Sequence, residues 1–147
     1  MNINENLKMK GELAITVRDQ LGRLKQTLVV PNLVVTTGKN YVASRMTGTS
    51  SNVMSHMAIG TGTSSPVVGD TALGTQAGRV SLSAFTAAAN AITATASFPA
   101  GTGTGAITEA GIFNASSGGD MLCRTTFPVV NKAAGDSISI SWVITVS

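Results

Sequence analysis

Two glycine-rich runs, AIGTGT at residues 58–63 and AGTGTG at residues 100–105, are the first places where this sequence could bind a ligand. A phosphate-binding loop needs glycines at fixed positions, so that backbone N–H groups point inward, and a helix that follows directly. Neither run has the spacing G-x-G-x-x-G or a Walker pattern, and the residues after Gly105 alternate as in a strand. We therefore interpret both runs as turns between strands.

Few other residues are placed for chemistry. Glu109 stands in the apolar run AITEAGIF, where burial could raise the pKa of a carboxylate and suit it to acid–base catalysis. No second carboxylate lies near it in sequence, so we expect a structural ion pair with Arg79 or Arg124. Cys123 is expected to be a buried structural thiol, and His56, the single histidine, a polar strand residue. The sequence thus predicts no enzyme, and no catalytic, metal-binding or cofactor-binding residue.

The composition indicates one domain with a weakly charged surface. A chain of 147 residues fits a single domain, and its one cysteine excludes an internal disulfide. Charged residues make up 12%, against roughly 25% in an ordinary soluble domain. Ala, Gly, Ser and Thr take their place, which favours strands joined by many turns. Such a surface is poorly protected against association. We expect neighbouring molecules to cover it; a neutral secreted or crystal-packing-prone surface is the alternative.

Basic residues gather in the first third of the chain, where seven of the ten Lys and Arg residues lie within residues 1–45. Nucleic-acid binding calls for a denser basic stripe with aromatic residues, and Tyr41 is the single aromatic residue of this third. An acidic protein partner, or simple solubility, explains the charge better, and we expect no nucleic acid. The candidate contacts with the partner or with other subunits are Lys8, Lys10, Arg18, Arg23 and Lys25. The polar start of the chain and the lack of an 18-residue apolar run predict neither a signal peptide nor a membrane contact.

The first half of the domain is predicted to begin with a hairpin. Residues 12–18 and 24–30 form its strands around a turn at Gly22, and residues 1–10 before it are expected to be a flexible arm. A single short helix is predicted near residues 38–46. Thr36 or Thr37 is its expected N-cap, and Gly48 its stop.

A strand within residues 53–60 that includes Val53, His56 and Met57 is expected next, and then a long connection at residues 61–78 of a kind that usually makes functional contacts. Five further strands are predicted at residues 79–86, 91–99, 106–114, 120–128 and 137–146. Asp120 and Asp136 are expected to close turns between them. One aromatic residue falls in each strand at intervals of 13 to 15 residues: Phe85, Phe98, Phe113, Phe127 and Trp142. This spacing, with the aromatic side chains on one face, predicts that residues 11–147 form a single all-β domain, an antiparallel β-sandwich that is jelly-roll-like.

Two segments, residues 56–79 and 105–147, resemble small virion proteins of tailed bacteriophages. The resemblance lies in a strand that ends in a GTGT turn and leads to a DTAL connection and an arginine, Arg79. It continues in the EAGIF strand, in the pattern M-L-x-R-x-x-F at residues 121–127, and in the closing pattern D-x-I-x-I-x-W at residues 136–142. Related modules occur in head decoration (cement) proteins and in fibre or tail components, so the resemblance implies a virion β-sandwich.

The chain shows no repetitive stalk and no heptads, which favours a decoration protein that binds and stabilises the head lattice. The resemblance then implies the major capsid protein (or other virion subunits) as partner and a homo-oligomer, namely a trimer. It also implies a place on the capsid surface of the virion after synthesis in the host cytoplasm. A head-fibre, neck or tail component of the particle is the alternative. A carbohydrate-binding β-sandwich is a third reading, weakened by the shortage of aromatic residues before Phe85.

Overall fold

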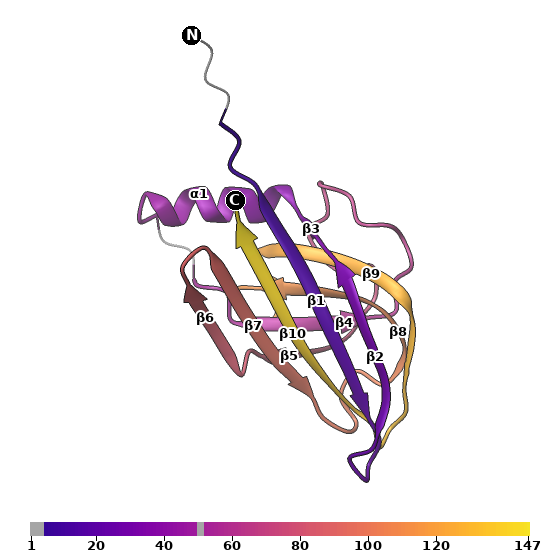
Figure 1. The fold of residues 1–147 in the computed structure, drawn as a ribbon. Coiled ribbons are helices and arrows are strands. Elements are labelled where there is room, and N and C mark those ends of the chain that lie inside the picture. Colours follow the sequence, from indigo (N-terminus) through magenta and orange to yellow (C-terminus); the bar gives the residue numbers. More distant parts are fainter. Residues whose placement is uncertain (1–4, 50–51) are drawn as a thin grey trace.

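A computed structural model describes residues 5–49 and 52–147 of the chain. It consists of two five-stranded antiparallel sheets packed face to face, with one helix across one end (Figure 1). The predicted all-β antiparallel sandwich with a single short helix is therefore confirmed. The likeness to a jelly roll is limited to the two packed sheets. The strand connections differ, because four of the strand pairs join strands that are consecutive along the chain.

The first sheet, sheet A, has the order β2-β1-β10-β7-β6. Its strands are β1 (Met9–Arg18), β2 (Leu24–Pro31), β6 (Ala84–Ala88), β7 (Ala91–Phe98) and β10 (Ser137–Val146). Alternation sets its inner face. On β1, for example, Leu13, Ile15 and Val17 are buried while the residues between them are not.

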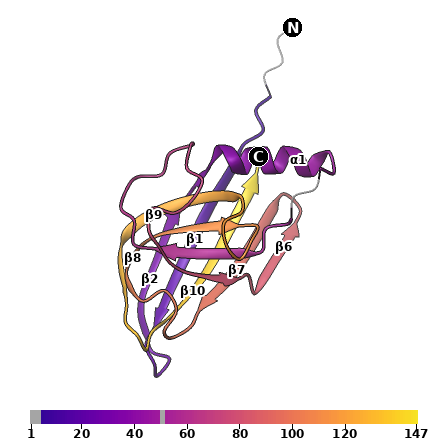
Figure 2. The same cartoon turned by 180° about the vertical axis from the view of Figure 1, so that it is seen from behind.

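The second sheet, sheet B, has the order β3-β9-β8-β4-β5. Its strands are β3 (Leu33–Val34), β4 (His56–Gly60), β5 (Gln76–Ser81), β8 (Gly105–Phe113) and β9 (Met121–Lys132). Unlike the strands of sheet A, β8 is buried on both faces from Ile107 onward. Viewed from behind, connections cross the outer side of this sheet (Figure 2). Sheet B is thus an inner layer, whereas sheet A keeps one side open.

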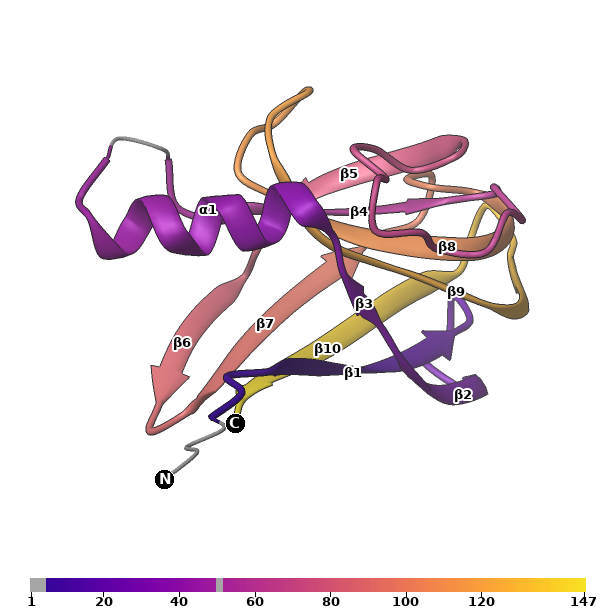
Figure 3. The ribbon, with the colours of Figure 1, turned by 90° about the horizontal axis from the view of Figure 1, so that it is seen from above.

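Helix α1 (Thr36–Met46) lies along one end of the sandwich (Figure 3). The predicted cap is wrong, because the N-cap is Val35 and no side chain bonds there. The helix is held instead by close packing: a Cβ added to Gly38 would lie 2.0 Å from the backbone oxygen of Leu122 on β9. The predicted stop agrees with the structure, since Gly48 follows the C-cap with a φ of 70°.

Three other predicted boundaries need correction. The arm predicted at residues 1–10 is shorter, because β1 begins at Met9 and the backbone of Lys8 exchanges two hydrogen bonds with Ser147; residues 1–4 lie outside the described part. The strand predicted at residues 79–86 is two strands, since the chain leaves β5 in sheet B and enters β6 in sheet A. Strand β4 begins only at His56.

The predicted aromatic residues are buried, with Phe98, Phe113, Phe127 and Trp142 between 0% and 7% exposed. Three of them belong to the main core between the sheets, but Phe113 does not. It packs with Val35, Ala58 and Met121 in a second cluster on the outer side of sheet B, under Leu73 of the long connection. The prediction that the aromatic side chains share one face is therefore wrong for Phe113.

Replacing Phe113 by alanine should lower the free energy of unfolding by about 3–5 kcal/mol, because it removes the centre of this second cluster. Chemical denaturation followed by tryptophan fluorescence measures the change. Val29, which is 60% exposed, provides the control: Val29→Ala should change stability by less than about 0.5 kcal/mol. Equal midpoints for Phe113→Ala and the wild type would show that the outer cluster contributes nothing.

Candidate interaction surfaces

Glu109 lies at the centre of a buried charge cluster on the outer side of sheet B. Its carboxylate accepts three backbone hydrogen bonds, from the N–H groups of Gly62 at 2.9 Å, Gly74 at 2.9 Å and Thr75 at 2.8 Å. The first glycine run therefore contributes one of the three N–H groups that bind an anion, and the anion is the protein's own side chain. A Cβ at Gly62 would lie 2.5 Å from Glu109 Oε1, which explains the glycine.

Arg124 completes the cluster from the neighbouring strand β9. Its guanidinium donates to Glu109 Oε2 from Nη2 at 2.8 Å and from Nε at 3.2 Å. It also reaches the long connection, donating to Asp70 Oδ2 and to the backbone oxygen of Ser64, both at 3.0 Å. Glu109 and Arg124 together fasten the connection at residues 61–75 over sheet B. The expected ion pair of Glu109 is confirmed with Arg124, while Arg79 stacks on the Phe113 ring at 3.8 Å.

This arrangement makes Glu109 a poor base. Burial alone would raise the pKa of its carboxyl group, but the hydrogen bonds from Thr75, Arg124, Gly74 and Gly62 more than offset burial and hold the pKa below its ordinary value. A carboxylate that already accepts five hydrogen bonds offers little to a substrate. The geometry supports a structural role.

Three other polar residues singled out in the sequence lie in separate places. Asp136 closes the turn before β10, accepting from the N–H of Ala133 at 2.8 Å. Cys123 is fully buried, and burial raises the pKa of its thiol far above the ordinary range. His56 lies beside Ser55 on β4, with 2.7 Å between its Nδ1 and the serine hydroxyl. Within the described residues, no three His, Cys, Asp or Glu side chains converge as a metal site would require.

The five predicted contact residues do not form one surface. Lys8 and Lys10 lie at the start of β1, beside α1. Arg18, Arg23 and Lys25 lie at the far end of the β1–β2 hairpin, roughly 30 Å away by the rise of a ten-residue strand. There, Arg23 pairs with Asp19 at 2.8 Å and Lys25 with Asp136. The hairpin end is thus partly neutralised, and Lys8 and Lys10 belong to a different site.

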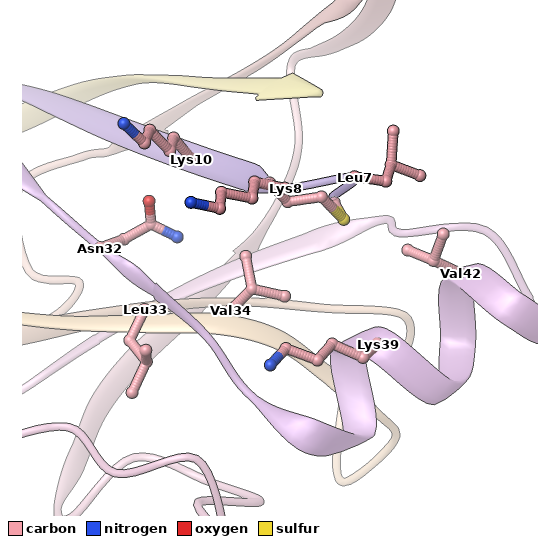
Figure 4. A pocket seen from close by; sticks show the side chains of 9 residues that line it. Leu7, Lys8, Lys10, Asn32, Leu33, Val34, Lys39 and Val42 are labelled. Carbon is pink, nitrogen blue, oxygen red and sulfur yellow. The ribbon is translucent and has the colours of Figure 1, made fainter. Parts of the chain in front are cut away.

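That site is a groove of about 420 Å³ between the start of β1, strand β3 and helix α1. We call it the lysine groove; it is lined by Leu7, Lys8, Met9, Lys10, Asn32, Leu33, Val34, Lys39 and Val42. Lys8 and Lys39 extend on either side of Val34, and the ammonium groups lie toward Asn32 (Figure 4). Leu7 and Val42 lie at the other end (Figure 4). Ammonium groups and apolar side chains therefore alternate along part of the groove, with Val34 between Lys8 and Lys39 and with Leu7 and Val42 beyond them.

The open side of sheet A carries no charge over most of its width. We call it the uncharged face. Its side chains come from all five strands, and the charged residues of the same side border it, Lys10 and Glu12 at one end of β1, and Arg18 and Lys25 at the other end of the β1–β2 hairpin. The uncharged face consists of Thr27, Val29, Ala14, Thr16, Ser139, Ser141, Val143, Thr93, Thr95, Ser97, Ala84, Thr86 and Ala88. The register places Ser141 at its centre, between Ala14 on β1 and Thr95 on β7. Small side chains thus form a continuous exposed surface across the sheet.

Comparison with protein-family models, with curated proteins and with solved structures found no match. Within the part of the chain that the structure describes, no helix combines the length and the apolar character needed to cross a membrane. Function must therefore be argued from the surfaces themselves.

Both surfaces escaped the sequence-based prediction for an identifiable reason. Lys39 was not grouped with Lys8 and Lys10, because only the fold brings the first turns of α1 beside β1. The uncharged face had a signal in the sequence, since the residues between the buried positions of β7 and β10 are Ser, Thr or Val. Reading those alternate positions together would have predicted it.

Replacing Glu109 by glutamine should destabilise the protein by about 3–5 kcal/mol, because buried Arg124 would lose its buried charge partner and keep only the partly exposed Asp70. The amide of the new glutamine would also direct its own N–H groups at neighbours that are themselves N–H donors. Glu12→Gln, an exposed change on β1 with the same chemistry, should stay within about 0.5 kcal/mol of the wild type. Urea denaturation measures both. A Glu109→Gln protein as stable as Glu12→Gln would mean that the cluster does not hold the connection.

The stability should also fall in acid. The pKa of folded Glu109 is held below its ordinary value of 4.5, so its stabilising contribution is present above that pH and is lost as the pH falls through the folded pKa. Asp136 acts in the same direction, because hydrogen bonds from Lys25 and Ala133 lower its pKa from 3.8. The free energy of unfolding should therefore decline below about pH 4.5, and less steeply in Glu109→Gln. Denaturation series between pH 7 and pH 2.5 test this; parallel curves for the two proteins would contradict it.

Proposed function

We propose that this chain is a structural protein of a tailed-bacteriophage virion, a capsid decoration or cement protein that binds the head lattice and stabilises it. The observation that carries the proposal is the uncharged face, an exposed five-stranded surface of small side chains on a fold whose other sheet is already covered. The resemblance of residues 56–79 and 105–147 to phage virion proteins supports the same class. No catalytic step is part of the proposal.

The physics of this face suits attachment to a flat protein surface. Ala, Ser and Thr lose little side-chain entropy when a partner covers them, and the middle of the face holds no charge that would have to lose its water. Such side chains seldom act as strong binding centres, so each contact contributes modest affinity. Weak contacts still hold a lattice when many copies bind and each bridges neighbouring subunits. We propose the major capsid protein as the partner and a homotrimer as the bound form.

The position and copy number of the protein on purified particles test this proposal. Quantitative mass spectrometry and electron cryomicroscopy should find hundreds of copies spread over the head. A handful of copies at a vertex, the neck or the tail would support the alternative, a fibre, neck or tail component. Absence from particles would overturn the proposal altogether.

A charge placed at the centre of the uncharged face should weaken attachment without weakening the fold. Ser141 is exposed on the middle strand, so Ser141→Arg should keep the wild-type stability and reduce occupancy on particles at least tenfold, since a buried unpaired charge is costly. Ser65→Arg makes the same change on the exposed long connection and should leave occupancy unchanged. Equal occupancy for the two variants would show that sheet A does not face the capsid.

A further inference from the structure

We propose that the lysine groove binds an extended segment of the shell subunit in which acidic residues alternate with aliphatic ones. This inference rests on the proposed function for the identity of the partner. It does not depend on the uncharged face, which lies on the outer side of sheet A and shares only the start of β1 with the groove.

The positive charge of the groove is uncompensated. No carboxylate of residues 5–49 and 52–147 lies within the 4.0 Å ion-pair distance of Lys8, Lys10 or Lys39, whereas Arg23, Lys25 and Arg124 all have such partners. Lys39 lies near the N-terminus of α1, where the helix dipole is positive and the first turn holds no acidic residue. Three like charges that line one groove, one of them near the positive end of a helix, repel one another in the isolated fold. An anionic ligand would relieve this repulsion.

The rest of the lining calls for aliphatic groups beside the anion. Leu7 is 75% exposed, and Met9, Leu33, Val34 and Val42 continue an apolar wall from it toward the lysines. A volume of about 420 Å³ is enough for a short stretch of extended chain with two or three side chains. Carboxylates near Lys8 and Lys39, with aliphatic side chains on Val34 and Val42, would satisfy both kinds of wall.

The same lining argues against other anions. The lysines stand on opposite walls, with Val34 between two of them, so they do not converge on one point as a phosphate site requires (Figure 4). No aromatic side chain is among the lining residues, so a nucleic-acid base would find no stacking partner. A peptide places its charges several ångströms apart along an extended backbone, which matches the two walls.

Binding of a labelled eight-residue peptide of alternating Glu and Leu, followed by fluorescence anisotropy with the full chain, tests the inference. We expect binding that weakens as salt rises from 50 to 500 mM, because exposed charges are screened. The Lys8→Gln/Lys39→Gln variant should bind about tenfold more weakly, from the loss of two exposed ion pairs. The Arg18→Gln/Arg23→Gln variant loses the same charge at the far hairpin end and should bind as the wild type does.

Control peptides separate the two halves of the site. Replacing Glu by Gln or Leu by Ser in the peptide should weaken binding in each case. No binding at 1 mM peptide, equal effects of the two double variants, or decanoate binding as tightly as the peptide would overturn the inference; the last result would indicate a small amphiphile. The capsid experiments are independent: the peptide assay with Lys8→Gln/Lys39→Gln tests the groove alone, and Ser141→Arg tests whether the protein attaches through sheet A.

Discussion

The arrangement of sheet B and of the connection that covers it depends on one buried carboxylate, that of Glu109. Glu109 has no aqueous surroundings, so its charge must be satisfied by neighbours, and those neighbours are three backbone N–H groups and one guanidinium. The N–H donors belong to the two ends of the same connection, residues 62 and 74–75. Binding both ends to one group shapes the connection between them and lays it over sheet B. Leu73 is thereby pressed onto Phe113 and its cluster.

The two sheets are consequently unequal. Sheet B is covered on its outer side, which is why β8 can be apolar on both faces and still belong to a folded monomer. Sheet A has no such cover, and the middle of its outer side carries mostly Ser, Thr and Ala, while the charges that usually keep an exposed sheet apart from its neighbours lie at the ends of β1 and β2. Because the long connection covers sheet B and, among the described residues, no connection covers sheet A, the outer side of sheet A is left for a partner to occupy.

Local patterns predicted most of the architecture. Alternation gave the β1–β2 hairpin and the strands from β7 to β10, and the single helix was expected at nearly its observed place. The misses have specific causes. Nothing in the run at residues 79–86 shows that the chain changes sheets, since both halves are strand-like. Phe113 directly follows Ile112, which lies in the main core, so the alternation within β8 places Phe113 on the outer face; the even spacing of the aromatic residues along the chain does not show this. The three backbone N–H groups that donate to Glu109 could not be predicted, because residue types in a sequence do not indicate where backbone donors will lie.

The uncharged face also has a consequence for orientation. A flat surface of serines, threonines and alanines offers contact area but few specific interactions. By itself it would let a bound molecule slide or turn. The features that can fix direction lie at the two ends of β1, the lysine groove at one and the hairpin arginines at the other. These two features lie roughly 30 Å apart, so small displacements at either of them change the orientation of the molecule only slightly. A positional tolerance of about 1 Å at either end then corresponds to an angular error of only about 2° over that length. On a curved shell, the bound orientation of this protein would therefore depend on the tilt between neighbouring subunits more strongly than the weak contacts at the centre of the uncharged face would suggest.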